Sequence, residues 1–115
     1  MMFRASLVAA SVLALLGLSS PAFAKGDAER GREKSQICQA CHGVDGNGIG
    51  DPQYPLIAGQ YEDYLSQSMR AYQTGERSNV IMQGFMATLT TQDIDDLAAF
   101  FAGQTGTLGD LSHYK

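Results

Sequence analysis

Hydrophobic positions recur at helical spacing in three parts of the chain, and they predict three helices separated by polar or glycine-rich segments. The first covers residues 28–40, where Asp27 is a candidate N-cap. The second covers residues 60–72. It carries most of its larger side chains on one face: Tyr61, Tyr64, Leu65, Ser68, Met69 and Tyr72. We expect those tyrosines mainly to pack there, with hydrogen bonding to a carboxylate of a bound group as the alternative role.

The third helix begins near Thr90 or Thr91 and ends at Gly103. The run from Thr90 to Asp93 resembles a capping box. Its apolar face follows the i, i+3, i+4, i+7 pattern through Ile94, Leu97, Ala98 and Phe101. No convincing strand pattern accompanies the three helices, so the chain is predicted to be all-α.

Two connecting segments separate the helices. Residues 43–59 contain five glycines and two prolines, which predicts a long loop. Residues 75–89 are expected to be irregular, with Gly75 ending the second helix. Gly31 is unusual inside the first helix, because glycine weakens a helix by about 1 kcal/mol relative to alanine.

The N-terminal segment has the pattern of a secretory signal peptide. A basic start containing Arg4 precedes the apolar run 7–18, and Ala22-Phe23-Ala24 is typical of a cleavage site. The run falls short of the ~20 residues that span a bilayer. We expect cleavage after Ala24, export to the periplasm, and no stable membrane insertion afterwards.

Cleavage would remove 24 of the 115 residues and leave one small domain, at residues 25–104, with a polar tail at 105–115. The formal charge of the whole chain is −4. Since Arg4 is the only charged residue removed, the mature protein becomes more acidic. An acidic domain is a poor binder of nucleic acid and is suited to a basic patch on a protein partner.

Cys38-Gln39-Ala40-Cys41-His42 carries the chemistry of the chain. Two cysteines at this spacing, with a histidine directly after the second, are typical of covalent haem attachment. Each thiol adds to one vinyl group, and the histidine becomes an axial ligand of the iron. A redox-active cysteine pair is the chemical alternative, but it favours a strand before the motif.

The second axial ligand decides the function. An iron with both axial positions occupied by the protein carries electrons, whereas an iron with one open position binds gas or peroxide. The candidates are Met69, Met82, Met86 and His113. Met69 lies on an apolar helix face, where methionine is usually core filler, and His113 lies in the tail. Met82 and Met86 both lie in the segment before the last helix, and spacing favours Met82 over Met86.

The chain resembles the class I c-type cytochromes, and especially each half of the tandem two-haem periplasmic cytochromes of bacteria. The resemblance covers nearly all of residues 25–104. It rests on an ordered series of motifs: Gly26-Asp27, the haem motif with Gly43, Asp45-Gly46-Asn47-Gly48, residues 55–60, residues 75–79, residues 81–84, and the last helix from Asp93 to Phe101.

The resemblance implies a small cytochrome c fold, with three main helices and loops around one covalent haem c. In that family the axial methionine stands seven residues before the leucine that introduces the final helix; Leu89 matches that leucine, which implies Met82. It also implies that the Pro55 carbonyl binds the ligand histidine, and that Gly31 lets the Phe100–Phe101 region approach. Behaviour that depends on two haems is not carried over.

The expected function is therefore periplasmic transfer of single electrons between redox partner proteins, without catalysis. Three alternatives stay open. The domain is a five-coordinate haem enzyme or gas-binding protein, it serves as the cytochrome subunit of a larger dehydrogenase or oxidase, or it is a thiol–disulfide oxidoreductase without haem.

Overall fold

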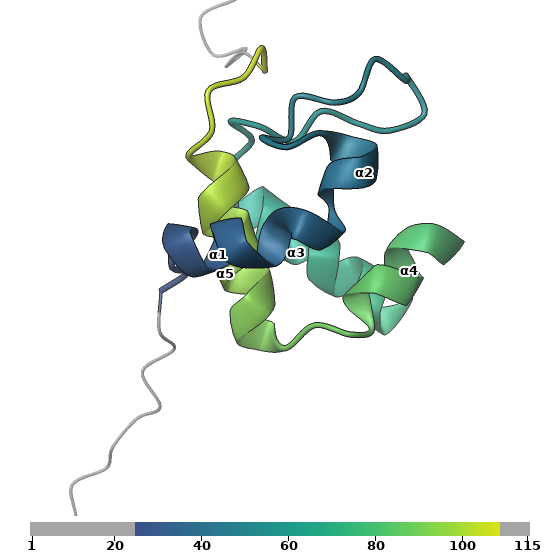
Figure 1. The fold of residues 1–115 in the computed structure, drawn as a ribbon. Helices are drawn as coiled ribbons and strands as arrows, with labels where there is room; N and C mark the ends of the chain where they lie inside the picture. Colours follow the sequence, from purple (N-terminus) through teal and green to yellow (C-terminus); the bar gives the residue numbers. More distant parts are fainter. Residues whose placement is uncertain (1–24, 109–115) are drawn as a thin grey trace, which may run out of the picture.

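The computed structural model describes residues 25–108, and these residues form helices and loops without a β-strand. The elements in chain order are α1 (Ala28–Lys34), a 3-10 turn η1 (Ser35–Ile37), α2 (Gln39–His42), α3 (Glu62–Thr74), α4 (Val80–Met86) and α5 (Thr91–Ala102) (Figure 1). The all-α prediction is confirmed. The expected signal peptide and His113 lie outside the described residues.

The predicted first helix is divided into three pieces. Ser35 donates a hydrogen bond from its hydroxyl to the Arg32 carbonyl at 2.7 Å, and the Cys38 N–H bonds to the Ser35 carbonyl at 2.8 Å. A serine that bonds to the backbone in this way competes with the α-helical ladder. The chain therefore forms the tighter 3-10 turn η1 before α2 begins, and this break changes the direction in which the haem motif runs.

The expectation that residues 75–89 are irregular was wrong, because α4 lies inside them. Asn79 caps this helix, and its side-chain oxygen accepts a hydrogen bond from the Met82 N–H at 3.0 Å. α4 has only seven residues, and it contains two β-branched residues and Gly84. Those residues have low helix propensity, so packing rather than propensity holds the helix.

The predictions for the other two helices held more closely. α3 begins and ends two residues later than predicted, and Gly75 follows it in the left-handed conformation with a φ of 81°. α5 has the predicted capping box: Thr90 accepts from the Asp93 N–H, and Asp93 accepts from the Thr90 N–H. None of the helices in residues 25–108 has the length and apolarity needed to cross a membrane.

α1 crosses α5 at close range, as Figure 1 shows. A β-carbon added at Gly31 would stand 1.9 Å from the Asp96 carbonyl oxygen and 2.8 Å from the Phe100 β-carbon. The prediction that Gly31 allows a close approach is confirmed for Phe100. The backbone of α5 at Asp96 comes closer still.

A buried carboxylate joins the same two helices. Asp96 accepts hydrogen bonds from the Asp27 N–H at 2.7 Å, from the Arg30 guanidinium at 2.9 and 3.1 Å, and from the Gln92 amide at 2.9 Å. Its side chain is 5% exposed. Burial acts to raise its pKa, but the bonds from Arg30, Asp27 and Gln92 outweigh burial and lower the pKa from 3.8 to about 2.

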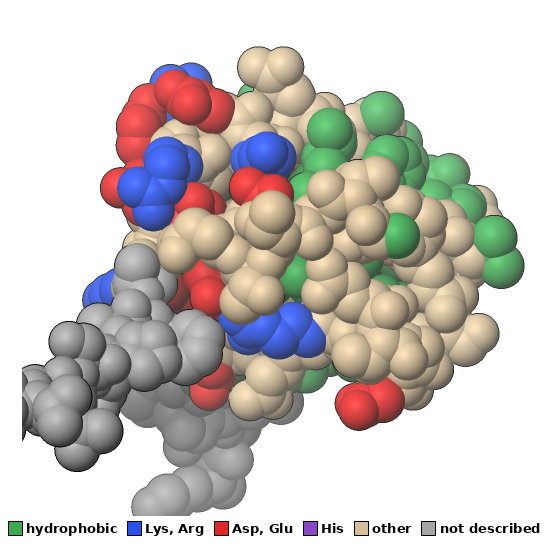
Figure 2. Space-filling view, turned by 90° about the horizontal axis from the view of Figure 1, so that it is seen from below, with side chains coloured by type: hydrophobic (Ala, Val, Ile, Leu, Met, Phe, Trp, Pro, Cys, Tyr) green, Lys and Arg blue, Asp and Glu red, His purple; other side chains and the backbone are tan. Residues whose placement is uncertain are grey.

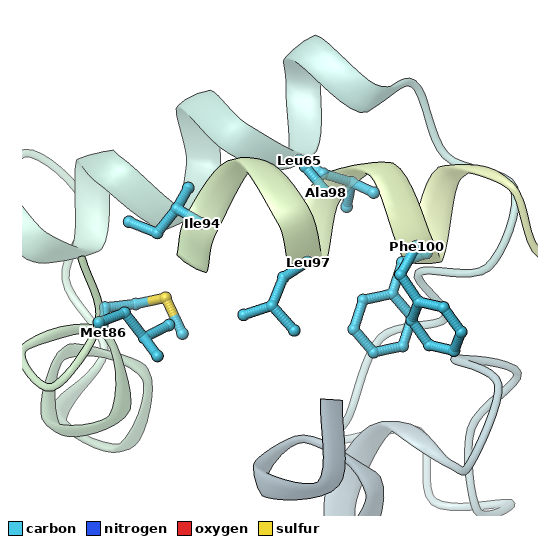
Figure 3. Close-up of a cluster of buried hydrophobic side chains, with 8 residues drawn as sticks. Leu65, Met86, Ile94, Leu97, Ala98 and Phe100 are labelled. Atoms are coloured by element: carbon cyan, nitrogen blue, oxygen red, sulfur yellow. The ribbon is translucent and has the colours of Figure 1, made fainter. Parts of the chain in front are cut away.

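The hydrophobic core lies between α3, α4 and α5 (Figure 3). α5 supplies most of it, and the Phe100 and Phe101 rings meet edge to face with centroids 4.9 Å apart. Its members are Leu65, Met86, Leu89, Ile94, Leu97, Ala98, Phe100 and Phe101. Met86 therefore belongs to the core, at 1% exposed.

Asp96→Asn should make the protein less stable at pH 6 and should lose that disadvantage in acid. A carboxyl whose folded pKa lies below its unfolded pKa contributes stability above the unfolded value, near 3.8, and loses it as the pH falls through about 2. The pKa difference corresponds to about 2 kcal/mol. Urea unfolding from pH 6 to pH 2 measures this, with the exposed Glu76→Gln as the control. A wild-type advantage that is constant with pH would contradict the assignment.

Candidate functional site

A largely apolar cavity of about 290 Å³ lies beside the core. Its walls are formed by the η1–α2 segment, the loop at residues 53–60, α3, the connection from α3 to α4, and α4, and α5 adds Phe101. Figure 1 shows α2 and α4 on the same side of the molecule, with α3 beside α4. The volume is close to the ~300 Å³ at which binding pockets for organic ligands begin.

The haem motif lines this cavity from one side. Cys38, Cys41 and His42 all contribute to its wall, and both thiols are free of a disulfide. Cys38 follows η1 directly, whereas Cys41 and His42 belong to the single turn of α2. The break in the first predicted helix therefore brings two thiols and an imidazole to one wall.

The His42 ring is held by one hydrogen bond, because its Nδ1 lies 2.9 Å from the Pro55 carbonyl oxygen. A carbonyl only accepts, so Nδ1 carries the hydrogen and donates it. In the neutral imidazole, Nε2 is then left with a lone pair for a metal. The predicted bond between His42 and Pro55 is confirmed.

The environment of Cys38 does not fit a thiol–disulfide oxidoreductase. Burial, with a smaller contribution from the neighbouring Cys41, raises the pKa of the Cys38 thiol to about 11. Reactive cysteines of that class have a lowered pKa, which supplies the thiolate at neutral pH. A strand before the motif, which that class favours, is also absent from the described residues.

Three of the predicted ligand candidates reach the cavity, namely Met69, Met82 and Met86. Met86 is buried in the hydrophobic core, and Met69 and Met82 are half-buried against it. Since α4 is helical, Met82 and Met86 stand four residues apart on one face and both point toward the core side. His113 lies outside the described residues.

Gln73 fixes the end of α4. Its side-chain amide donates to the Met86 carbonyl at 2.9 Å and to the Leu89 carbonyl at 2.8 Å. These two bonds tie α3 to the turn between α4 and α5. Sequence reasoning did not identify Gln73, and no local pattern marks a clamp that joins residues 13 and 16 positions apart.

The residues of the cavity fit a haem c. Two free thiols can form the thioether bonds, the His42 Nε2 and a methionine sulfur can bind iron on its two sides, and aliphatic and aromatic side chains suit the porphyrin.

Sequence reasoning also did not assign Gln53, Tyr54 and Arg77 to the cavity wall. Arg77 had one available signal: it is the only lysine or arginine between Arg70 and the end of the chain apart from Lys115.

Known proteins have sequences similar to this chain. Cytochrome c4 of Pseudomonas aeruginosa is 43% identical over 99 residues, which cover 86% of this chain and 49% of that protein. Cytochrome c-554(548) of Halomonas halodenitrificans is 40% identical over 82 residues, which cover 69% of this chain and 98% of that protein. The chain therefore spans about half the length of the cytochrome c4 that it matches.

The fold comparison agrees with the sequence comparison. The crystal structure of reduced recombinant cytochrome c4 from Pseudomonas stutzeri superposes with a TM-score of 0.68 at 40% identity, over 73% of this chain and 48% of that chain. The family model named Cytochrome c matches residues 28–104. This chain therefore belongs to the cytochrome c family, whose domain binds one haem c covalently through two cysteines.

Proposed function

We propose that this protein is a periplasmic carrier of single electrons, with Cys38 and Cys41 bonded to haem c, and with His42 and Met82 as the axial ligands. Met86 is the second candidate for the methionine. The observation that carries the proposal is that both thiols, the imidazole and the methionines line one apolar cavity. When bound, haem c supplies an iron that gains and loses one electron, and methionine ligation raises its potential.

The ligand residues are held by contacts that do not depend on the iron. The Pro55 carbonyl fixes the orientation and tautomer of His42. Gln73 clamps the C-terminal end of α4, and Asn79 caps its N-terminal end, so Met82 lies on a helix fixed at both ends. A site held in this way changes little between two oxidation states, which favours rapid electron transfer.

The wall of the cavity also favours a carrier over an enzyme. General acid–base catalysis needs a carboxyl, histidine or similar group within hydrogen-bond reach of the reacting atoms. Among the described residues, the lining contains no aspartate or glutamate, and its one histidine already has an assigned role. This supports the carrier over the five-coordinate enzyme.

Periplasmic location is supported by the signal peptide pattern at residues 1–24.

Redox partners would meet the protein at the exposed apolar rim of the cavity, where Ile37, Leu56 and Phe85 are 39%, 40% and 41% exposed. Figure 2 shows most of the charged side chains of one face gathered on one side and most of the hydrophobic side chains on the other. A small rim of this kind suits brief encounters.

The test is expression in a periplasm that matures c-type cytochromes. We expect a haem-stainable band on a denaturing gel, a one-electron redox titration, and no binding of carbon monoxide by the reduced protein at neutral pH. A colourless protein with two thiols open to alkylation would overturn the proposal. Rapid binding of carbon monoxide by the wild type would instead favour the five-coordinate alternative.

The same preparation separates a free carrier from a subunit of a larger dehydrogenase or oxidase. A carrier elutes alone in gel filtration of the periplasmic extract and exchanges electrons with added partners. A subunit elutes with a second polypeptide of fixed stoichiometry, and that result would replace the free carrier.

A further inference from the structure

The charge of the cavity wall differs from that of the rest of the protein. The chain is acidic, with 12 aspartates and glutamates against 8 lysines and arginines. Among the residues described, however, the wall contains no carboxylate, and its one permanently charged side chain is Arg77. A cation placed in this way, in an acidic domain, indicates that the bound group is itself anionic at that point.

Arg77 also differs from four of the other five lysines and arginines among residues 25–108; Lys25, which does not line the cavity, is the fifth. Four other cations bind carboxylates: Arg30 binds Asp96, Arg32 binds Glu29, Lys34 binds Asp93, and Arg70 binds Asp95. Within residues 25–108, no carboxylate lies within 4.0 Å of Arg77, and its guanidinium donates no hydrogen bond there. Five N–H donors are thus free beside the cavity.

The guanidinium is nevertheless held in place. It lies 5.0 Å from the centroid of the Tyr72 ring, within the range of a cation–π contact. The Arg77 N–H bonds to the Ala71 carbonyl at 3.0 Å, which fixes the backbone just after α3. Tyr64, Ser68 and Tyr72 follow one another at four-residue spacing along α3 and line the same wall. A row of hydroxyls therefore leads to Arg77.

We propose that Arg77 binds a propionate carboxylate of haem c and thereby sets the potential of the iron; this inference rests on the proposed function. The vinyl and propionate groups occupy opposite edges of the porphyrin. The cysteines that take the vinyl groups lie directly after η1 and in α2, whereas Arg77 lies on a different wall, between α3 and α4. Arginine binds a carboxylate with two parallel hydrogen bonds, which suits this role.

Two effects on the redox equilibrium follow. A positive charge near the haem disfavours the ferric state, so removal of Arg77 should lower the midpoint potential at high pH. Arg77 also keeps the propionate ionised, because an adjacent cation favours the charged form. Without Arg77 the propionate binds a proton more readily, and it binds that proton more tightly when the iron is ferrous. Protonation then favours the ferrous state at low pH, so the midpoint potential of the variant should fall as the pH rises.

The other groups that face this site do not produce such a step. The ionisable side chains of the wall are Cys38, Cys41, His42, Tyr54, Tyr64, Tyr72 and Arg77. In the loaded protein the thiols are thioethers and His42 binds iron, while phenols in general ionise near pH 10. A new pH-dependent step between pH 5 and pH 8 therefore reports the propionate.

The experiment is spectroelectrochemistry of the haem-loaded protein from pH 5 to pH 8, on the wild type and on Arg77→Gln, Arg77→Lys and Arg32→Gln. Arg32→Gln is the matched control, since it removes the same charge from an exposed pair on α1. We expect a flat potential in the wild type and the control. Arg77→Gln should show a more negative potential at pH 8 and a slope at lower pH, and Arg77→Lys should largely restore the wild-type profile.

Equal shifts and equal pH profiles for Arg77→Gln and Arg32→Gln would overturn the proposal, because Arg77 would then act only as one surface charge among others. Failure of Arg77→Lys to restore the profile would overturn it as well. Failure of the proposed function is distinguishable, since the wild type itself would then lack covalent haem on a denaturing gel.

Discussion

Met82→Ala should leave haem attached to the protein but should open the iron to external ligands. We expect the reduced variant to bind carbon monoxide at neutral pH, the ferric variant to lose its methionine charge-transfer band, and the midpoint potential to fall. The physical reason is that a thioether ligand stabilises the ferrous state and raises the potential. Optical spectra and a redox titration measure all three changes.

Met86→Ala is the matched comparison, because the two methionines lie on one face of α4. Met86 is 1% exposed and packs in the core, so its truncation should cost about 2–5 kcal/mol of folding free energy. Met82 is half-buried beside the cavity and is freer to act as a ligand. We therefore expect Met86→Ala to keep the charge-transfer band and to unfold at lower temperature.

The opposite pair of outcomes would exchange the assignments. If Met82→Ala kept the band and Met86→Ala lost it, Met86 would be the ligand. If both variants kept the band, Met69 on the neighbouring helix α3 would be the remaining described methionine at the cavity.

The haem motif could be recognised from the sequence because its chemistry is local. Cys38, Cys41 and His42 lie within five residues, and their spacing is typical of covalent haem attachment. The amphipathic pattern of α5 is similarly local, and the residues from Thr90 to Asp93 predict its capping box. The carbonyl partner of His42 lies 13 residues away, and only the family resemblance indicated it.

α4 shows where sequence reasoning failed and why. Val80, Ile81 and Gly84 are weak helix formers, so local propensity favoured an irregular segment. The Asn79 cap and the packing of Met86 against the core outweigh that preference. The capping asparagine was the one available signal, and it was recognised only as part of a family motif.

Contacts between distant segments could not be predicted from one sequence. Asp96 and Arg30 are 66 residues apart, and neither stands in a pattern that marks a buried ion pair. The absence of carboxylates among the described residues of the cavity wall is similar, because that wall is assembled from separate segments of the chain. Only the fold shows that Arg77 lines the cavity, whereas the four cations that pair with carboxylates do not.

Gly31→Ala should destabilise the protein by roughly 3 kcal/mol or more, although alanine is the better helix former by about 1 kcal/mol. The new β-carbon would stand 1.9 Å from the Asp96 carbonyl oxygen, and this backbone atom cannot turn aside as a side chain can. α1 would have to move away from α5. That movement would weaken the hydrogen bonds from Arg30 and Asp27 to Asp96 and expose part of the core.

Gly84→Ala is the control, because it makes the same change in a helix where the added β-carbon meets no atom within 4 Å. It should stabilise α4 by up to about 1 kcal/mol. Urea unfolding of the haem-loaded protein compares both variants with the wild type. If Gly31→Ala were as stable as Gly84→Ala, helix propensity would outweigh packing at this crossing, and the close contact of α1 with α5 would not be what excludes a side chain at residue 31.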